Sequence, residues 1–250
     1  MRTFITLTRR ELASFFVSVT GYVIIAATTF LMGLNLVVVL DDLGSKPTPM
    51  PVTELLYLTY FFWLILLLAA PVITMRLFAQ EKFSGTFETL MTTPVRDMTV
   101  VLAKFAAAFG FYLVMWLPML GCLLVVQRFA NQPTMLDAGT LGGMSLGVAL
   151  VGALFLALGC FASALTRSQM VAAMVTLALS VSLFALGFLA DRMSAGGYWP
   201  AQVLGYFALF DQMHDFARGV VDTRAVVFYL SLTLLLLFLT LRVVESRRWR

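Results

Sequence analysis

Few side chains in this sequence could carry out chemistry of their own. The chain has one histidine, His214, and two cysteines, Cys122 and Cys160, and none of them stands in a spacing typical of metal ligands or of a redox pair. A lone histidine without a second histidine or a clustered cysteine favours a polar residue at a membrane interface over a ligand or a general base. No nucleophile, base or metal-ligand set is clustered elsewhere. The sequence therefore predicts a protein that is not an enzyme.

A phosphate-binding loop is also missing from the sequence. There is no G-x-x-x-x-G-K-[ST] pattern, in which backbone N–H groups and a lysine hold the phosphates of a nucleotide. We therefore expect the chain to bind no cofactor itself. Any energy from ATP must reach it through another polypeptide.

One charged stretch indicates contact with a partner: RLFAQEKFSGTFETLMTTP, residues 76–94, between two apolar runs. Its apolar side chains recur at helical spacing and would share one face: Phe83, Phe87, Leu90 and Met91. Gly85 permits close backbone approach, and Pro94 should end the helix. Periodicity alone supports a helix lying on lipid as well as one docking on a protein. Glu81 and Glu88 are poorly suited to an anionic leaflet and favour the protein.

The elements that position this stretch follow from composition. With 61% hydrophobic and 12% charged residues, the chain is too apolar for a soluble domain. A membrane-spanning helix needs about 20 mainly apolar residues. Six such stretches occur, at residues 18–40, 55–73, 99–126, 139–165, 169–190 and 225–243. The sequence therefore predicts an all-α polytopic membrane protein with six transmembrane helices.

The N-terminal segment, residues 1–16, precedes the first span and has an amphipathic pattern. Phe4 and Leu12 can share an apolar side while Arg9 and Arg10 face lipid headgroups, which predicts a helix lying in the membrane plane. A plain cytoplasmic tail is the alternative. No small-residue cleavage site follows, so we expect this segment to be retained.

Positively charged residues predict the orientation of the chain. Most lysines and arginines lie at the two ends of the chain, between the second and third spans, and at the turn between the fourth and fifth. Most acidic residues fall on the other side. Because positive residues are retained in the cytoplasm, both termini and residues 76–94 are expected there. The net charge of +4 reflects this topology and indicates no nucleic-acid partner.

The stretch between the second and third spans resembles the signature of ABC-2 type transporter permeases. The matching residues are Arg76, Glu81, Gly85, Thr86, Glu88 and Leu90, then Thr93, Pro94 and Val95, and finally Lys104. The resemblance covers essentially the whole chain, residues 1–250, as a single transmembrane domain in a bacterial inner membrane. It implies an interfacial helix at 1–16, six spans, and a coupling helix at 76–93 that contacts a separate ATP-binding subunit.

The same resemblance implies coupling residues and partners. The residues expected to couple the chain to the ATPase are Glu81, Phe83, Gly85, Thr86, Phe87, Glu88, Leu90 and Met91. The two glutamates would orient or contact the ATPase, Gly85 would allow close docking, and Phe87 and Leu90 would anchor it. ATP and Mg²⁺ would be held by the ATPase. Two copies of this chain, or this chain and a homologous permease, would form the pathway in the lipid bilayer.

A second resemblance lies at residues 210–222, FDQMHDFARGVVD, which are similar to permeases of the gliding-motility-associated and nitrous-oxide-reductase-maturation branch. It implies that residues 195–224 form an outer re-entrant or interfacial region. The residues marked there are Phe210, Asp215, Phe216, Arg218, Gly219 and Asp222. In this branch a separate periplasmic or membrane subunit often assists, so an auxiliary partner is expected.

Taken as a permease, the chain would couple ATP hydrolysis by the separate subunit to export or flipping of a substrate that the sequence leaves open. Two alternatives also stay open: an ATPase-driven subunit that does mechanical or signalling work on the envelope, and a membrane scaffold that transports nothing. In the fourth span, Gly143 and Gly147 would allow close helix contact, for which packing within one subunit is favoured over a dimer seam.

Overall fold

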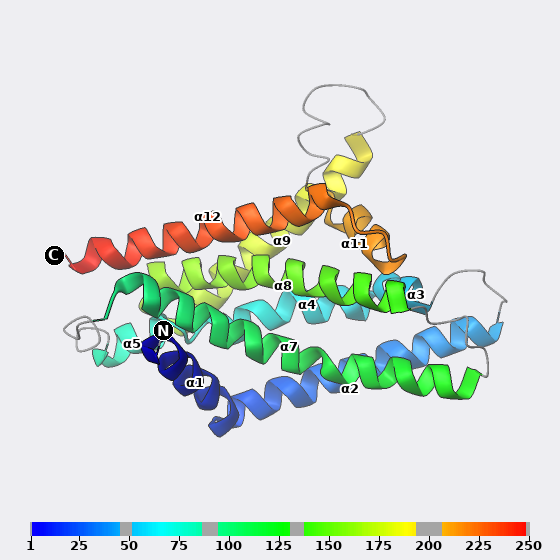
Figure 1. Cartoon of the computed structure of the whole chain (residues 1–250), viewed down its shortest axis with the longest axis horizontal. Coiled ribbons are helices and arrows are strands. Elements are labelled where there is room, and N and C mark those ends of the chain that lie inside the picture. Colours follow the sequence, from blue (N-terminus) through cyan, green and yellow to red (C-terminus); the bar gives the residue numbers. More distant parts are fainter. Residues whose placement is uncertain (1, 46–51, 87–94, 131–137, 194–206, 249–250) are drawn as a thin grey trace.

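The computed structural model describes residues 2–45, 52–86, 95–130, 138–193 and 207–248, which form helices and no strand. In chain order the helices are α1 (Arg2–Val17), α2 (Val19–Ser45), α3 (Val52–Leu58), α4 (Tyr60–Thr74), α5 (Ala79–Ser84), α7 (Asp97–Ala130), α8 (Ala138–Leu165), α9 (Gln169–Met193), α11 (Leu209–Ala217) and α12 (Thr223–Arg248). Figure 1 shows the long helices gathered into one elongated bundle. The predicted all-α class is confirmed.

Six helices in the described part of the chain are long and apolar enough to cross a membrane: Val19–Asp42, Tyr60–Ser84, Asp97–Val126, Ala138–Leu165, Gln169–Gly187 and Thr223–Ser246. The predicted number of spans is therefore confirmed. The second span begins later than expected, because Thr59 has an extended backbone (φ −75°, ψ 139°) that separates the short α3 from α4. Glu54 consequently lies on α3, outside the span.

Helix α8 forms the centre of the bundle. It packs against α4, α7, α9, α11 and α12, and most of its side chains are buried. Phe155 of α8 is fully enclosed. The hydroxyl of Tyr112 on α7 donates to the carbonyl oxygen of Val148 on α8 at 3.1 Å. Helices on every side of α8 explain why its sequence is apolar around the whole circumference.

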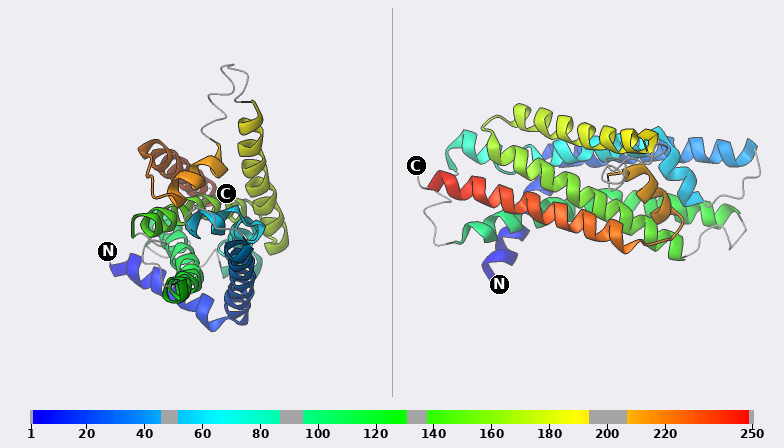
Figure 2. Two further views of the ribbon diagram at one scale, coloured as in Figure 1. Left: turned by 90° about the vertical axis from the view of Figure 1, so that its right-hand side faces the viewer. Right: turned by 90° about the horizontal axis from the view of Figure 1, so that it is seen from above.

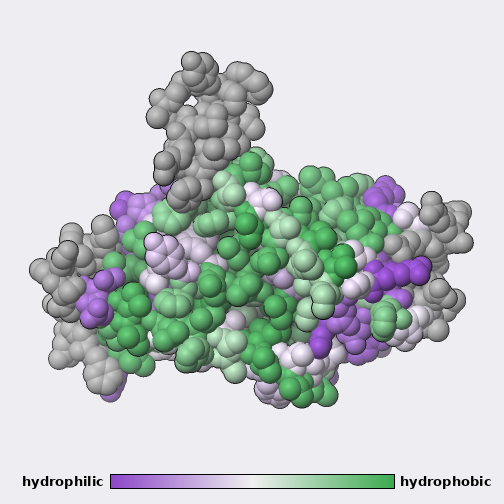
Figure 3. All heavy atoms as spheres, turned by 180° about the vertical axis from the view of Figure 1, so that it is seen from behind, coloured by the Kyte–Doolittle hydropathy of each residue, from purple (hydrophilic) through white to green (hydrophobic). Residues whose placement is uncertain are grey.

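The outer helices present apolar side chains to their surroundings. Phe30 of α2, Met174 of α9 and Leu234 of α12 are 67%, 66% and 64% exposed. Figure 3 shows such side chains covering the middle of one face, with hydrophilic residues toward its ends. An apolar belt between two polar ends is the surface expected of a protein whose middle is surrounded by lipid.

The two termini lie toward the same end of the bundle, where α5 also lies, whereas α3 and α11 lie toward the other end (Figure 1). Helix α1 runs obliquely to the long helices (Figure 2). It packs on α7, where the rings of Phe15 and Phe111 stack with centroids 4.8 Å apart. The amphipathic N-terminal segment thus forms a separate helix at the end of the bundle that carries α5.

Candidate functional site

The charged stretch after the second span folds as a turn followed by a short helix. Helix α4 ends at Thr74, residues 75–78 form a turn, and α5 begins at Ala79. The helix expected at 76–93 therefore starts later than the sequence indicated. Four of its expected coupling residues lie outside the described residues: Phe87, Glu88, Leu90 and Met91.

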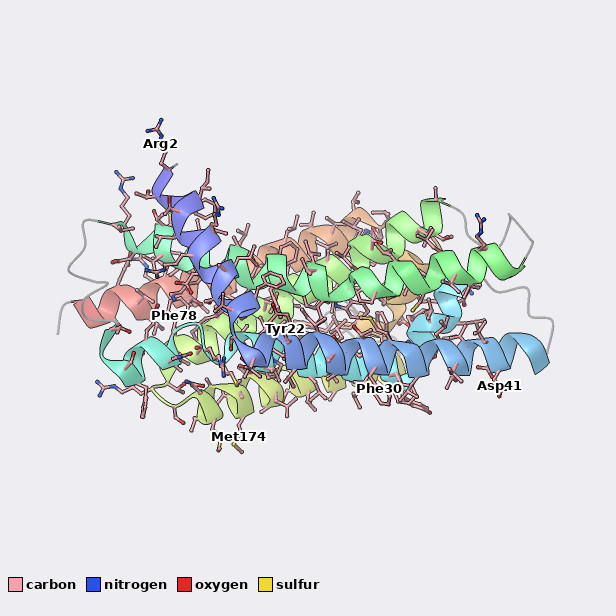
Figure 4. The ribbon with its side chains drawn as sticks, turned by 90° about the horizontal axis from the view of Figure 1, so that it is seen from below. Arg2, Tyr22, Phe30, Asp41, Phe78 and Met174 are labelled. Atoms are coloured by element: carbon pink, nitrogen blue, oxygen red, sulfur yellow. The ribbon has the colours of Figure 1, made fainter. Side chains whose placement is uncertain are left out.

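Helix α5 is anchored on the C-terminal end of α8. The backbone N–H groups of Phe78 and Ala79 both donate to Oγ of Ser163, each at 3.1 Å. The first N–H groups of a helix have no partner within that helix, so Ser163 caps α5 from a different one. Lys82 of α5 also donates to the carbonyl oxygen of Ala164. Figure 4 labels Phe78 at this end of the bundle and Asp41 at the other.

Lys104 of α7 joins three helices at the same end. Its Nζ lies 2.7 Å from Oε1 of Glu81 on α5 and 3.4 Å from Oε2 of Glu11 on α1. We call these three residues the Lys104 cluster. The Lys104 side chain is only 3% exposed, and an ammonium so buried is tolerated only beside opposite charge. Glu81, an expected coupling residue, is thus engaged on its inner side and ties α5 to α7.

A polar cavity of about 330 Å³ lies beside the Lys104 cluster. Its lining includes Ser14 of α1, Gln80 of α5, and Arg76 from the turn. Arg76 donates from one terminal nitrogen to Oγ of Ser18 at 3.0 Å and to the hydroxyl of Thr20. These bonds attach the turn after α4 to the junction between α1 and α2.

The outward side of α5 carries Phe83, which is 81% exposed. An exposed aromatic ring on an anchored backbone is available for contact with another protein or with the lipid interface. Gly85 has φ 73°, the left-handed conformation in which helices commonly end. Among the described residues, no atom lies within 4 Å of a Cβ placed on Gly85. Gly85 therefore ends α5 by its conformation, and the close docking on the ATPase expected of it stays a prediction.

A second group of polar residues lies at the opposite end, around Glu54. Oε1 of Glu54 lies 2.7 Å from Nε2 of His214 and accepts a hydrogen bond from a terminal nitrogen of Arg218 at 3.0 Å. Oε2 accepts a second bond, from Nε of Arg218, at 3.2 Å. The Glu54 side chain is 3% exposed. We call Glu54, His214 and Arg218 the Glu54 cluster; it joins α3 to α11, whose C-cap is Arg218.

Burial and hydrogen bonding act in opposite directions on Glu54. Burial of the carboxyl group raises its pKa, the hydrogen bonds from Arg218 and His214 lower it, and the net pKa lies below the ordinary value of 4.5. Its contribution to stability is therefore present above about pH 4.5 and is lost only as the pH falls through that lowered pKa. Glu54 thus remains ionised, and able to pair with Arg218, at neutral and mildly acidic pH.

Two of the expected outer residues position α11 in the bundle. Phe210 packs on Tyr57 of α3, with ring centroids 5.4 Å apart. Phe216 is buried, and a Cβ on Gly143 of α8 would lie 2.5 Å from its carbonyl oxygen. A Cβ on Gly147 would lie 2.9 Å from Cβ of Phe216. The prediction that these two glycines serve packing within one subunit is confirmed.

The other expected outer residues follow Phe216 or face away from the bundle. Asp215 is exposed, while Arg218 belongs to the Glu54 cluster. Gly219 has φ 80°, a conformation that turns the chain away from α11. The carboxylate of Asp222 accepts a hydrogen bond from the backbone N–H of Arg224 at 2.9 Å, at the start of α12. These residues therefore shape the connection between α11 and α12.

Some residues of both clusters were not identified from the sequence as site residues. Lys104 was noted only as part of the signature, and Glu11 and Glu54 were not singled out for any role. The available signal for Glu54 was a single acidic residue at the edge of an apolar run. Its pairing with Arg218 joins residues 164 positions apart, so no local pattern shows it.

Comparison with protein families supports the resemblance seen in the sequence. A family model described as ABC-2 family transporter protein matches residues 16–243. The matched range contains α2 through α11 and most of α12. A comparison with curated proteins found no match.

Proposed function

Because the chain belongs to the ABC-2 family of transporter proteins, we propose that a separate ATPase drives it from the end of the bundle that carries α5. Members of this family are membrane subunits of ABC transporters and perform no catalysis themselves. The chain is accordingly a multi-pass membrane subunit of such a transporter.

The observation that carries this proposal is the two-sided placement of α5. On one side Phe83 is exposed. On the other side Glu81 pairs with Lys104 of α7, and the first N–H groups of α5 bind Ser163 of α8. A force applied to the exposed side would therefore pass directly into two spans, and through Glu11 into α1.

The proposed mechanism follows from these connections. Two ATPase subunits, each holding ATP and Mg²⁺, close and press on α5 of each permease subunit. Because α5 is bonded to α7 and α8, the spans reorient together, and an outward path opens between two copies of this chain or between it and a homologous permease. The cargo would be exported or flipped across the membrane.

The proposed location is a bacterial inner membrane with both termini and α5 in the cytoplasm. The distribution of lysines and arginines supports this orientation, as does the position of both termini toward the α5 end (Figure 1). Residues 210–222 support assignment to the gliding-motility-associated and nitrous-oxide-reductase-maturation branch, and with it an auxiliary periplasmic or membrane subunit.

The decisive experiment is purification of the tagged chain from its native membrane in mild detergent, with mass spectrometry of the proteins that stay bound. Phe83→Asp places a charge on the exposed side of α5. Val220→Asp is the matched control, because Val220 is also an exposed apolar residue, 57% exposed, and lies beyond α11. We expect a Walker-type ATPase with the wild type and with Val220→Asp, and its loss with Phe83→Asp.

Each other result contradicts part of the proposal. An ATPase that remains bound to Phe83→Asp would exclude the docking role of α5. Absence of any ATPase from the wild type would favour the scaffold. ATP hydrolysis by the reconstituted complex without movement of any solute or lipid would favour mechanical work on the envelope.

A further inference from the structure

The Glu54 cluster lies at one end of a continuous stretch of chain that reaches the opposite end of the bundle. Helix α3 carries Glu54, α4 follows after the break at Thr59, and α5 follows after the turn at residues 75–78. The same stretch therefore bears the exposed Phe83 near one end and the buried Glu54 at the other. Figure 1 shows α3 and α11 near each other and α5 far from both.

Helix α11 depends on its neighbours for its position. It has nine residues, and helices of this length are marginal in water without tertiary contacts. Its buried side chains are Leu209, Met213, Phe216 and Ala217. Toward α8 these contacts are made against backbone, since Phe216 lies on Gly143 and Gly147.

Toward α3, in contrast, the contacts of α11 are directional. Arg218 makes two hydrogen bonds to the Glu54 carboxylate, at 3.0 and 3.2 Å, and His214 lies 2.7 Å from it. The hydroxyl of Thr53 donates to the carbonyl oxygen of Ala217 at 2.7 Å. Two adjacent residues of α3 therefore hold the end of α11: Thr53 binds its backbone, and Glu54 binds the side chains of His214 and Arg218.

We propose that Glu54 is a positioning residue that makes α11 move together with α3 and α4. When α3 and α4 shift, the bonds from Glu54 to Arg218 and His214 carry α11 with them. The outer end of the bundle at α11 would thereby follow the helix that leads to α5. This inference rests on the proposed function only for its last step, the link to ATP.

The first test needs no nucleotide and measures backbone hydrogen exchange of α11 in the purified full-length chain. With Glu54→Gln and with Arg218→Gln we expect exchange in α11 to be about tenfold faster or more, the factor that loss of one hydrogen bond to a charged group implies. Arg224→Gln is the matched control, because it removes a positive charge at the start of α12 and leaves the Glu54 cluster intact. Unchanged exchange in Glu54→Gln would overturn the proposal.

The double variant separates pairing from general packing. Arg218→Gln leaves a buried carboxylate with His214 as its only remaining side-chain partner in the cluster, which is costlier than the loss of the pair as a whole. Adding Glu54→Gln to Arg218→Gln should therefore restore part of the protection of α11. If the effects of the two substitutions on hydrogen exchange in α11 simply add, Glu54 and Arg218 act separately, and the proposal is wrong.

The second test follows movement in the complex with its ATPase. Spin labels at Tyr60→Cys on α4 and Asp215→Cys on α11, in a background lacking Cys122 and Cys160, report the distance between the two helices. We expect this distance to be the same with and without trapped nucleotide when Glu54 is present, and to change with nucleotide in Glu54→Gln. A distance that stays constant in Glu54→Gln, while nucleotide moves other label pairs, would overturn the positioning role.

A separate label pair distinguishes this failure from failure of the proposed function. Labels at Ser84→Cys on α5 and Ser168→Cys beside α9 report the end that the ATPase would contact. If nucleotide leaves this distance unchanged in the wild type, the proposed function fails. The hydrogen-exchange result still decides whether Glu54 holds α11.

Discussion

At the scale of single residues, two buried charges organise the two ends of the molecule. Lys104 is enclosed beside Glu81 and Glu11, and Glu54 is enclosed beside Arg218 and His214. Each buried charge lies on one helix and its partners lie on others, so each pairing fixes the relative position of whole elements. Such pairs contribute more to the choice of one arrangement than to net stability, because desolvation offsets much of their attraction.

Replacing Lys104 should show how far the packing of α1, α5 and α7 depends on its two ion pairs. Lys104→Met keeps an unbranched side chain of similar length but leaves Glu81 and Glu11 without their shared cation, and we expect a loss of about 1–3 kcal/mol in the free energy of unfolding. This loss of stability is smaller than for a fully buried ion pair, because the Glu81 and Glu11 side chains are 21% and 14% exposed.

The control for this variant is Arg242→Met. Arg242 pairs with Glu245 at 3.0 Å, but their side chains are 63% and 36% exposed, so its loss should cost less than about 1 kcal/mol. Reversible unfolding in mixed micelles measures the free energy of unfolding of the two purified variants. Equal losses in the two variants would contradict a structural role for the Lys104 cluster.

At the scale of elements, the position of α11 depends on the absence of side chains from one side of α8. Gly143 lies directly under the end of α11: an added Cβ would be 2.5 Å from the carbonyl oxygen of Phe216 and 3.0 Å from Cα of Gly219. Both nearby atoms belong to backbone, so they cannot give way by changing a rotamer. The helix itself would have to shift.

We therefore expect Gly143→Ala to destabilise the chain by about 1–3 kcal/mol through overpacking. Gly142→Ala is the matched control, since a Cβ on Gly142 meets no atom within 4 Å. Alanine is the better helix former, so Gly142→Ala should be neutral or stabilising by up to about 1 kcal/mol. Thermal unfolding of the two variants in detergent gives the comparison; a harmless Gly143→Ala would mean that α11 does not sit on α8 as described.

At the scale of the whole molecule, the bundle has two distinct ends joined by an apolar middle. Both termini and α5 lie toward one end, and α3 and α11 lie toward the other (Figure 1). The Lys104 cluster belongs to the first end and the Glu54 cluster to the second. In the described part of the chain six candidate spans run between them, so the proposed coupling from α5 to α11 would cross the full length of the bundle.

Cysteine labelling tests the orientation of these two ends. In a background lacking Cys122 and Cys160, a membrane-impermeant maleimide added outside intact cells should label Asp215→Cys on α11. Ser168→Cys, at the turn before α9, should react only after the membrane is opened. The reverse pattern would place α5 outside the cell and exclude an ATPase partner in the cytoplasm.

Local sequence patterns are enough to establish the class of the protein and its spans. Apolar runs of about 20 residues are a local property, since a helix crossing lipid must satisfy its own backbone and bury its own side chains. The charged stretch at residues 76–94 was also recognisable from local sequence, because it separates two apolar runs. The resemblance at residues 210–222 also marked the region in which α11 lies.

Which charged residues pair depends on how the helices pack. The pairs Lys104–Glu11 and Glu54–Arg218 join residues far apart in the chain, and no periodicity predicts them. The packing of α7 and α8 beside α5 also determines which face of this short helix is buried. Glu81 therefore pairs with Lys104, while Phe83 is exposed. Local sequence specifies an element and its faces; which face becomes buried depends on the elements that pack against it.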